Sequence, residues 1–148
     1  MSWFGAALLT AFSLGGCEVV PAAEMHAPAA VYSENEILTD AAVYKSKDPD
    51  VIVIKTFGIS MQPIYREGTI ILFKPDKMED LQAGEVIAYR NSAGQVIVHR
   101  LVHLYSGGWL VQGDHNSEPD RELVTPQNLI GVEIAHYFPA GTEGDNNQ

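Results

Sequence analysis

The chain has 148 residues, of which 46% are hydrophobic and 19% are charged, and this balance is typical of one globular domain with a sizeable core. Its 19 acidic residues outnumber 9 basic ones, so the formal net charge at pH 7 is −10. This charge argues against phosphate-backbone binding, and we expect no nucleic-acid partner. A single cysteine excludes an internal disulfide and argues against a multi-cysteine zinc site, so neither a metal nor a cofactor is expected.

Residues 1–17 are predicted to be a signal segment. Trp3 to Gly16 is an uncharged apolar stretch of 14 residues, which is too short for an ordinary membrane span but matches a signal-peptide core. It ends in Leu14-Gly-Gly-Cys17, which resembles the lipobox of bacterial lipoproteins, although no Lys or Arg precedes it. Cys17 is therefore a candidate lipidation site. A buried apolar cysteine at the end of a short membrane-associated helix is the alternative.

Residues 18–50 are predicted to form a tether followed by a short helix. Val20 to Ala30 is rich in Ala and Pro, as is typical of extended linkers. Ser33 and Glu36 have the spacing of a helix capping box. The helix is expected over residues 33–44, with these apolar residues near one face: Ile37, Leu38, Ala41 and Tyr44.

From residue 51 to residue 138 the pattern predicts an all-β domain. Apolar runs of strand length alternate with turn formers, and no long stretch has helical periodicity. Lys74-Pro-Asp-Lys77 and Asn91-Ser-Ala-Gly94 are typical turns. Residues 139–148 are predicted to be a polar, flexible tail. Strands are expected near residues 51–57, 68–74, 84–91, 95–105, 108–113 and 130–138.

Ser60 is the candidate nucleophile, because it follows the first of these strands at a sharp change in backbone character. Gly58 would allow a close backbone approach, and Pro63 disfavours helix in the residue before it. A serine in this setting can expose its hydroxyl and donate its own N–H to a developing oxyanion. An ordinary turn serine is the structural alternative. Catalysis would also require a base within hydrogen-bond reach of the hydroxyl.

His99 is the candidate base. It lies inside an apolar strand, where alternation places its imidazole on the same face as Ile97 and Leu101. A polar ring on such a face needs a hydrogen-bond partner or a cleft, and a satisfied core histidine is the structural alternative.

The loop Gly113 to Asp120 carries two carboxylates, Asp114 and Asp120. Either of them could fix the tautomer of an imidazole and stabilise the cation that forms when it accepts a proton. The density of turn formers in this loop also has a purely structural explanation.

Three segments occur in order along the chain. They are Ser60-Met-Gln-Pro with Gly68, Val98-His-Arg-Leu, and Gly113-Asp-His-Asn-Ser-Glu-Pro-Asp120 followed by Val124-Thr-Pro-Gln-Asn-Leu-Ile-Gly131. Together they resemble the signal peptidase I and LexA-like serine peptidase group, and specifically the His-containing signal peptidases of archaea, the endoplasmic reticulum and sporulating Gram-positive bacteria. Ordinary bacterial signal peptidases carry Lys in the second segment, whereas this chain has no lysine after Lys77. The resemblance spans about residues 51–138 and implies a partly open barrel of coiled antiparallel strands.

The resemblance implies Ser60 as nucleophile, His99 as general base and Asp120 as the third member, with Asp114 structural or auxiliary. Because Gly58 stands where signal peptidases often have a hydroxyl, backbone N–H groups would have to stabilise the oxyanion.

The expected protein is a membrane-tethered serine endopeptidase that cuts peptides or preproteins after small residues. Its N-terminus would hold it at the membrane, with the catalytic domain, residues 51–138, on the extracytoplasmic side. A self-cleaving or regulatory LexA-type peptidase and an inert lipoprotein binding module stay open as alternatives.

Overall fold

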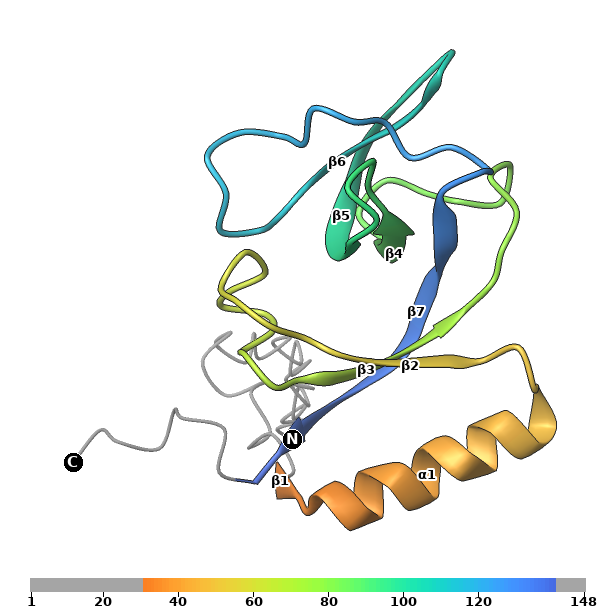
Figure 1. Ribbon diagram of the computed structural model, residues 1–148, viewed down its shortest axis with the longest axis vertical. Helices are drawn as coiled ribbons and strands as arrows, with labels where there is room; N and C mark the ends of the chain where they lie inside the picture. The colour runs from red at the N-terminus through yellow and green to blue at the C-terminus, as the bar shows by residue number, and fades with distance from the viewer. Residues whose placement is uncertain (1–30, 141–148) are drawn as a thin grey trace, which may run out of the picture.

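The computed structural model describes residues 31–140 (Figure 1), so the expected signal segment, Cys17 and the tether up to residue 30 lie outside the described residues. Each strand expected from the sequence is present within two residues at either end, and the mainly β fold is confirmed. β1 was not expected. The elements are β1 (Val31–Tyr32), α1 (Glu34–Lys47), β2 (Ile52–Lys55), β3 (Ile70–Lys74), β4 (Val86–Arg90), β5 (Val96–Tyr105), β6 (Gly108–Gln112) and β7 (Leu129–Pro139).

The strands form an open, mainly antiparallel sheet in the order β2-β3-β7-β4-β5-β6, and the short β1 adds to β7 in parallel. β7 joins the two halves of this sheet, since residues 132–137 pair with β3 and residues 129–132 pair with β4. A Cβ on Gly131 would lie 2.6 Å from the carbonyl oxygen of Lys74, so only glycine allows this close approach of backbones.

The helix α1 begins at Ser33 with the predicted capping box and runs three residues beyond its expected end. Its buried face is narrower than the sequence pattern indicated. Ile37 and Ala41 are buried, whereas Leu38 and Tyr44, expected on the same face, are 53% and 39% exposed. The helix therefore contacts the sheet along a thin stripe.

Three apolar clusters hold the sheet together, and two of them lie next to the candidate site residues. The cluster beneath the Ser60 turn ties that turn to β3 and β4, and the cluster on the His99 face of β5 ties β4, β5 and β6 together. The first consists of Met61, Tyr65, Ile71, Phe73, Val86 and Ala88. The second consists of Leu81, Ile87, Tyr89, Leu101, Trp109, Val111 and Val124.

Candidate active site

Ser60 lies in the turn that follows β2. Gly58 has a φ of 87°, and no heavy atom lies within 4 Å of the place where its Cβ would be. The close approach expected there is therefore wrong, and this glycine serves the left-handed backbone conformation instead. Beyond the serine, Met61 and Tyr65 are buried at 5% and 4% exposure and anchor the turn to the core.

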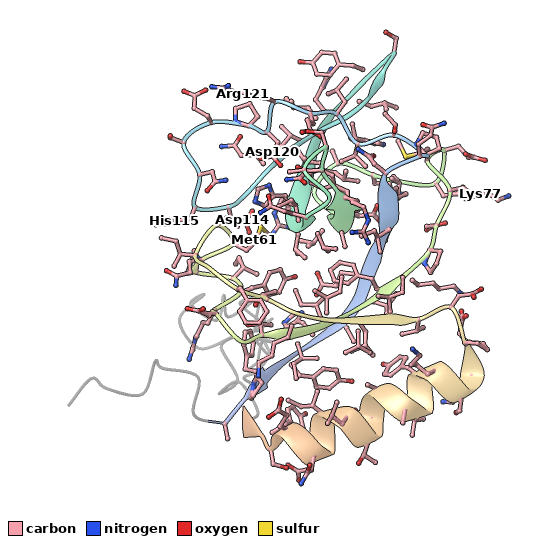
Figure 2. All side chains as sticks on the ribbon, viewed as in Figure 1. Met61, Lys77, Asp114, His115, Asp120 and Arg121 are labelled. Carbon is pink, nitrogen blue, oxygen red and sulfur yellow. The ribbon has the colours of Figure 1, made fainter. Side chains whose placement is uncertain are left out.

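The fold brings His99 and Asp120 to this serine from different elements. The Nε2 atom of His99 on β5 lies 3.1 Å from Oγ of Ser60, and its Nδ1 lies 2.7 Å from Oδ2 of Asp120. The imidazole is 8% exposed and the carboxylate 15% exposed, so little water competes for either bond. Figure 2 shows Met61, Asp114, His115 and Asp120 at the same corner of the molecule.

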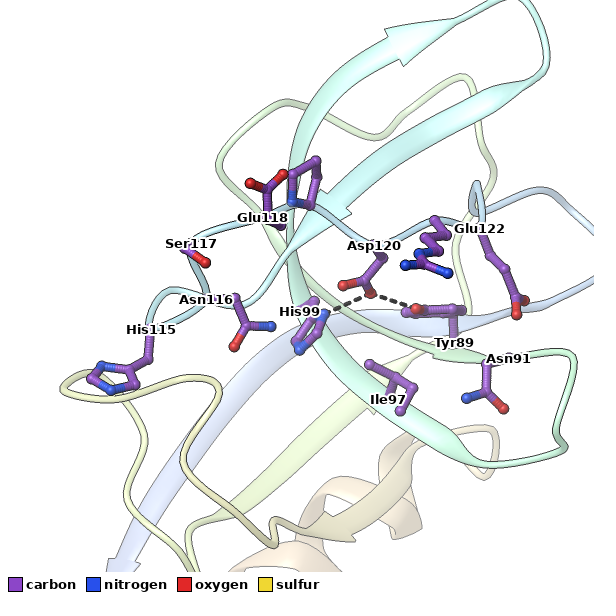
Figure 3. Close-up of a pocket in the computed structure, with 12 residues that line it drawn as sticks. Tyr89, Asn91, Ile97, His99, His115, Asn116, Ser117, Glu118, Asp120 and Glu122 are labelled. Carbon is purple, nitrogen blue, oxygen red and sulfur yellow. Dashed lines mark hydrogen bonds and ion pairs between the residues drawn. The ribbon is translucent and has the colours of Figure 1, made fainter.

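Tyr89 is a residue of this site that the sequence did not reveal. It lies on β4 opposite Ile97 of β5, is 3% exposed, and donates its hydroxyl hydrogen to Oδ2 of Asp120 (Figure 3). Burial raises the pKa of Asp120, but the hydrogen bonds with His99 and Tyr89 outweigh burial, so this pKa lies below its ordinary value. The carboxylate is therefore held in its ionised form.

Asp114 takes a different place from Asp120. Its two oxygens accept bonds from Nε and Nη2 of Arg100, at 2.8 and 2.6 Å, and Nη1 of the same guanidinium donates to the carbonyl of Gly84. Arg100 therefore holds Asp114 in a bidentate pair, which agrees with a structural role for this carboxylate. This pair fastens the loop after β6 to β5 without contacting the imidazole.

The glycine that does make a close approach is Gly113. A Cβ there would lie 2.6 Å from the carbonyl oxygen of Ser60 and 2.8 Å from Nε2 of His99. The same loop holds the serine, because the N–H of His115 donates to the Ser60 carbonyl over 2.8 Å. Any larger side chain at position 113 would separate the serine from the histidine.

A second polar cluster lies behind the Ser60 turn. The hydroxyl of Tyr65 donates to Glu133 on β7, and the other oxygen of that carboxylate bonds Nδ1 of His136 at 2.6 Å. Burial together with the bond to Glu133 raises the pKa of Tyr65, so the phenol stays neutral. These contacts join the serine turn to the strand that connects the two halves of the sheet.

Two cavities meet at His99 and Ile97. The first, of about 310 Å³, extends from Ser60 and is lined by residues 54–58 on one side and residues 96–99 on the other. The second, of about 630 Å³, lies under the loop of residues 115–122 and contains Asp120 but not Ser60. A substrate at the serine could therefore continue into either cavity.

In the described part of the chain, no cluster of His, Cys, Asp or Glu side chains is arranged to hold a metal ion. Over residues 31–140, no helix is long and apolar enough to cross a membrane.

Comparison with known proteins agrees with the mainly β fold. Residues 18–133 match the family model described as Peptidase S24-like. The chain is 37% identical over 84 residues to a signal peptidase complex catalytic subunit sec11 of Pyrenophora tritici-repentis, covering 53% of this chain and 47% of that protein. It is 35% identical over 97 residues to SEC11 of Leptosphaeria maculans, covering 61% and 54%. It is 31% identical over 85 residues to signal peptidase I W of Bacillus subtilis, covering 54% and 45%.

These matches, with the mainly β fold and a serine beside a histidine, define a peptidase-type domain. The chain belongs to the Peptidase S24-like family. It spans about half the length of the curated relatives it matches.

Proposed function

We propose that this protein is a serine endopeptidase in which Ser60 is the nucleophile, His99 the general base and Asp120 the residue that orients the base. The observation that carries the proposal is the chain of hydrogen bonds from Oγ of Ser60 through the imidazole to Oδ2 of Asp120. A nucleophile, a base in contact with it and a third group in contact with the base are what acyl transfer requires.

In the first step, Oγ of Ser60 bonds to the carbonyl carbon of the scissile peptide bond and its proton passes to Nε2 of His99. The C–N bond then breaks, and the imidazolium returns that proton to the leaving amine. Water repeats the sequence to release the acid. The N–H of Ser60 has no acceptor among residues 31–140, so it is free to donate to the developing oxyanion.

The sheet offers an extended peptide a place beside the serine. β6 pairs with β5 only from Arg100 onward, so residues 96–99 have one edge without a strand in the described sheet. The backbone of Thr56 likewise bonds on one side only, to Gly68 and Thr69, the two residues before β3. A substrate strand between these edges would form backbone hydrogen bonds, and the cleft that Met61 and Tyr65 line would receive one of its side chains. Cleavage after small residues is what the resemblance to signal peptidases implies.

The surface near the serine supports a position at a membrane. Phe57, Ile59 and Ile64 are 80%, 55% and 47% exposed in the turn that carries Ser60. Clustered apolar side chains of this kind mark interaction surfaces. We infer that the protein is tethered through its N-terminus, with lipidated Cys17 as the anchor, on the extracytoplasmic side. Its substrates would be peptides or preproteins.

A serine-directed acylating probe, such as a fluorophosphonate, tests the proposal directly. We expect the full chain to be labelled at Ser60, and the label to disappear in Ser60→Ala. The matched control is Ser106→Ala, which removes an exposed serine on the β5–β6 turn and should leave labelling intact. An unlabelled wild-type chain would favour the inert binding module instead.

A further inference from the structure

We propose that the cavity under the loop of residues 115–122 binds the leaving segment of the substrate, meaning the residues after the scissile bond, and that Asn116 hydrogen-bonds this segment. The cavity measures about 630 Å³, enough for one or two residues of a peptide. This inference rests on the proposed function and adds a second binding region, with a preference of its own, to the same site.

The first argument is position. The two cavities share His99, but only the smaller one contains Ser60. The acyl part of a substrate stays bonded to Ser60, whereas the amine departs next to the atom that protonates it, Nε2 of His99. We therefore assign the cavity that the histidine lines without the serine to the departing amine.

The second argument is Asn116, whose side chain lies beside His99 in Figure 3. A Cβ on Gly113 would lie 2.8 Å from Nε2 of His99 and 2.9 Å from Nδ2 of Asn116, so both nitrogens border one small space. The backbone of Asn116 is held at both ends: its N–H donates to Gly113 and its carbonyl accepts from Nε2 of Gln112. Its side-chain amide has no hydrogen-bond partner among residues 31–140. A fixed backbone with a free amide provides a positioned contact for a peptide group.

The third argument is charge, and it indicates the chemical class of the leaving segment. Glu118, Asp120 and Glu122 line the cavity together with one arginine, Arg121. Glu118 is exposed and its carboxylate has no partner in the described part of the chain. A polar or positively charged residue after the scissile bond should therefore bind better than an acidic one.

Acyl transfer measures this region separately from the rest of the site. The full chain in detergent is acylated with acetyl-Ala-Ala-Ala thiobenzyl ester, and an amino-acid amide is added. Water and the amine then compete for the same acyl-enzyme. When the amine wins, its nitrogen bonds to the acyl carbon, the ester bond to Oγ of Ser60 breaks, and the proton lost by the amine passes through His99 to that oxygen. Mass spectrometry gives the ratio of aminolysis to hydrolysis.

Mass spectrometry over a time course also gives the rate of aminolysis, and we expect this rate to saturate with alaninamide concentration in the wild type, which shows that the amine binds before it reacts. Asn116→Ala should lower the ratio about fivefold, as expected for one lost hydrogen bond. Asn116→Asp keeps the side-chain shape while removing the N–H donor, and it should lower the ratio as well. The matched control is Asn35→Ala, an exposed asparagine on α1, which should not change the ratio.

Charge selectivity is measured with argininamide and glutamamide. We expect the acyl-enzyme to react with argininamide about threefold more often than with glutamamide, a small factor because an exposed charge pair contributes little free energy. Glu118→Gln should reduce this preference.

Three results would overturn the inference although Ser60 is acylated: an aminolysis rate that rises linearly without saturation, equal ratios in Asn116→Ala and the wild type, or aminolysis and hydrolysis lowered together. The last result would place Asn116 in oxyanion stabilisation. Failure of the wild type to form any acyl-enzyme would instead overturn the proposed function, and this inference with it.

Discussion

Tyr89 and His99 bond to the same atom, Oδ2 of Asp120, from the neighbouring strands β4 and β5. The phenol therefore acts on the imidazole only through the carboxylate. If the proposed roles are correct, Tyr89 is a positioning residue that keeps Asp120 ionised and in place.

Tyr89→Phe should lower kcat about tenfold, since a hydrogen bond to a charged group contributes roughly 1.5 kcal/mol. The bond from Tyr89 is one of the causes that lower the pKa of Asp120, so removing it should raise the pKa of this carboxylate, which a carboxyl carbon-13 NMR titration measures. Tyr105→Phe, at a 51% exposed tyrosine, is the control. In an Asp120→Asn background, a further loss from Tyr89→Phe would show that the tyrosine acts by another route.

Ser60→Ala and His99→Ala should each abolish peptide cleavage, with losses on the order of 10⁴ to 10⁶ in kcat. Ser60 gives up the proton that His99 accepts, so each residue is of little use without the other. The double mutant should therefore be hardly slower than either single mutant. His103→Ala changes an exposed histidine on the same strand and should retain activity. Losses that multiply in the double mutant would mean that serine and histidine do not work as a unit.

Asp120→Asn and Asp114→Asn should damage different properties. The amide at position 120 favours the wrong imidazole tautomer, which costs about 10⁴ in rate in the serine protease example. The amide at position 114 weakens the pair with Arg100, which is partly exposed, so we expect about 1 kcal/mol of lost stability and a smaller loss of rate. Measuring kcat and Tm for both variants decides between them, and the reverse pattern would make Asp114 the catalytic carboxylate.

The sequence predicted the six long strands well because apolar runs and turn formers are local signals. It also singled out Ser60, His99 and Asp120, which the fold brings together, while their chemical roles stay a prediction. Tyr89 and Arg100 were missed because their contacts depend on strand pairing and loop closure. The sequence cannot distinguish the roles of Gly58 and Gly113. The structure shows that Gly58 serves a left-handed backbone conformation, whereas Gly113 allows a close contact with Ser60 and His99.

The attachment of α1 should weaken in alkali. The hydroxyl of Tyr137 on β7 donates to Asp40 on α1 over 3.1 Å, and burial, reinforced by this bond, raises the pKa of Tyr137 to about 12. Because the folded state favours the neutral phenol, Tyr137 stabilises the fold fully below the ordinary tyrosine pKa, about 10. This stabilisation is lost as the pH rises through the pKa of Tyr137 in the folded state. Tyr137→Phe should therefore show a smaller fall in Tm between these limits than the wild type. Tyr105→Phe, at an exposed tyrosine on β5, is the control. A fall in Tm in Tyr137→Phe equal to that in the wild type would contradict the assignment.

Cys17→Ser should release the protein from membranes or leave it unprocessed, since the apolar stretch before the cysteine is too short to span a bilayer comfortably. Fractionation of cells, with mass spectrometry of the mature N-terminus, measures both outcomes. An intact Met1 together with an unmodified thiol in the wild type would remove the lipid anchor from the proposal.

The pairing of β7 with both halves of the sheet makes the distance between Ser60 and His99 a matter of strand alignment. A slip of two residues between β3 and β7 would keep every side chain on its own face, yet it would shift β4 and β5 by about 7 Å relative to the serine turn. Gly131 opposes such misalignment, because only a residue without a side chain fits against Lys74. A misaligned molecule would still be a well-packed β protein, but Ser60 would be out of hydrogen-bond reach of His99. Loss of activity in this fold can therefore arise from a change at Gly131, without any change in the site itself.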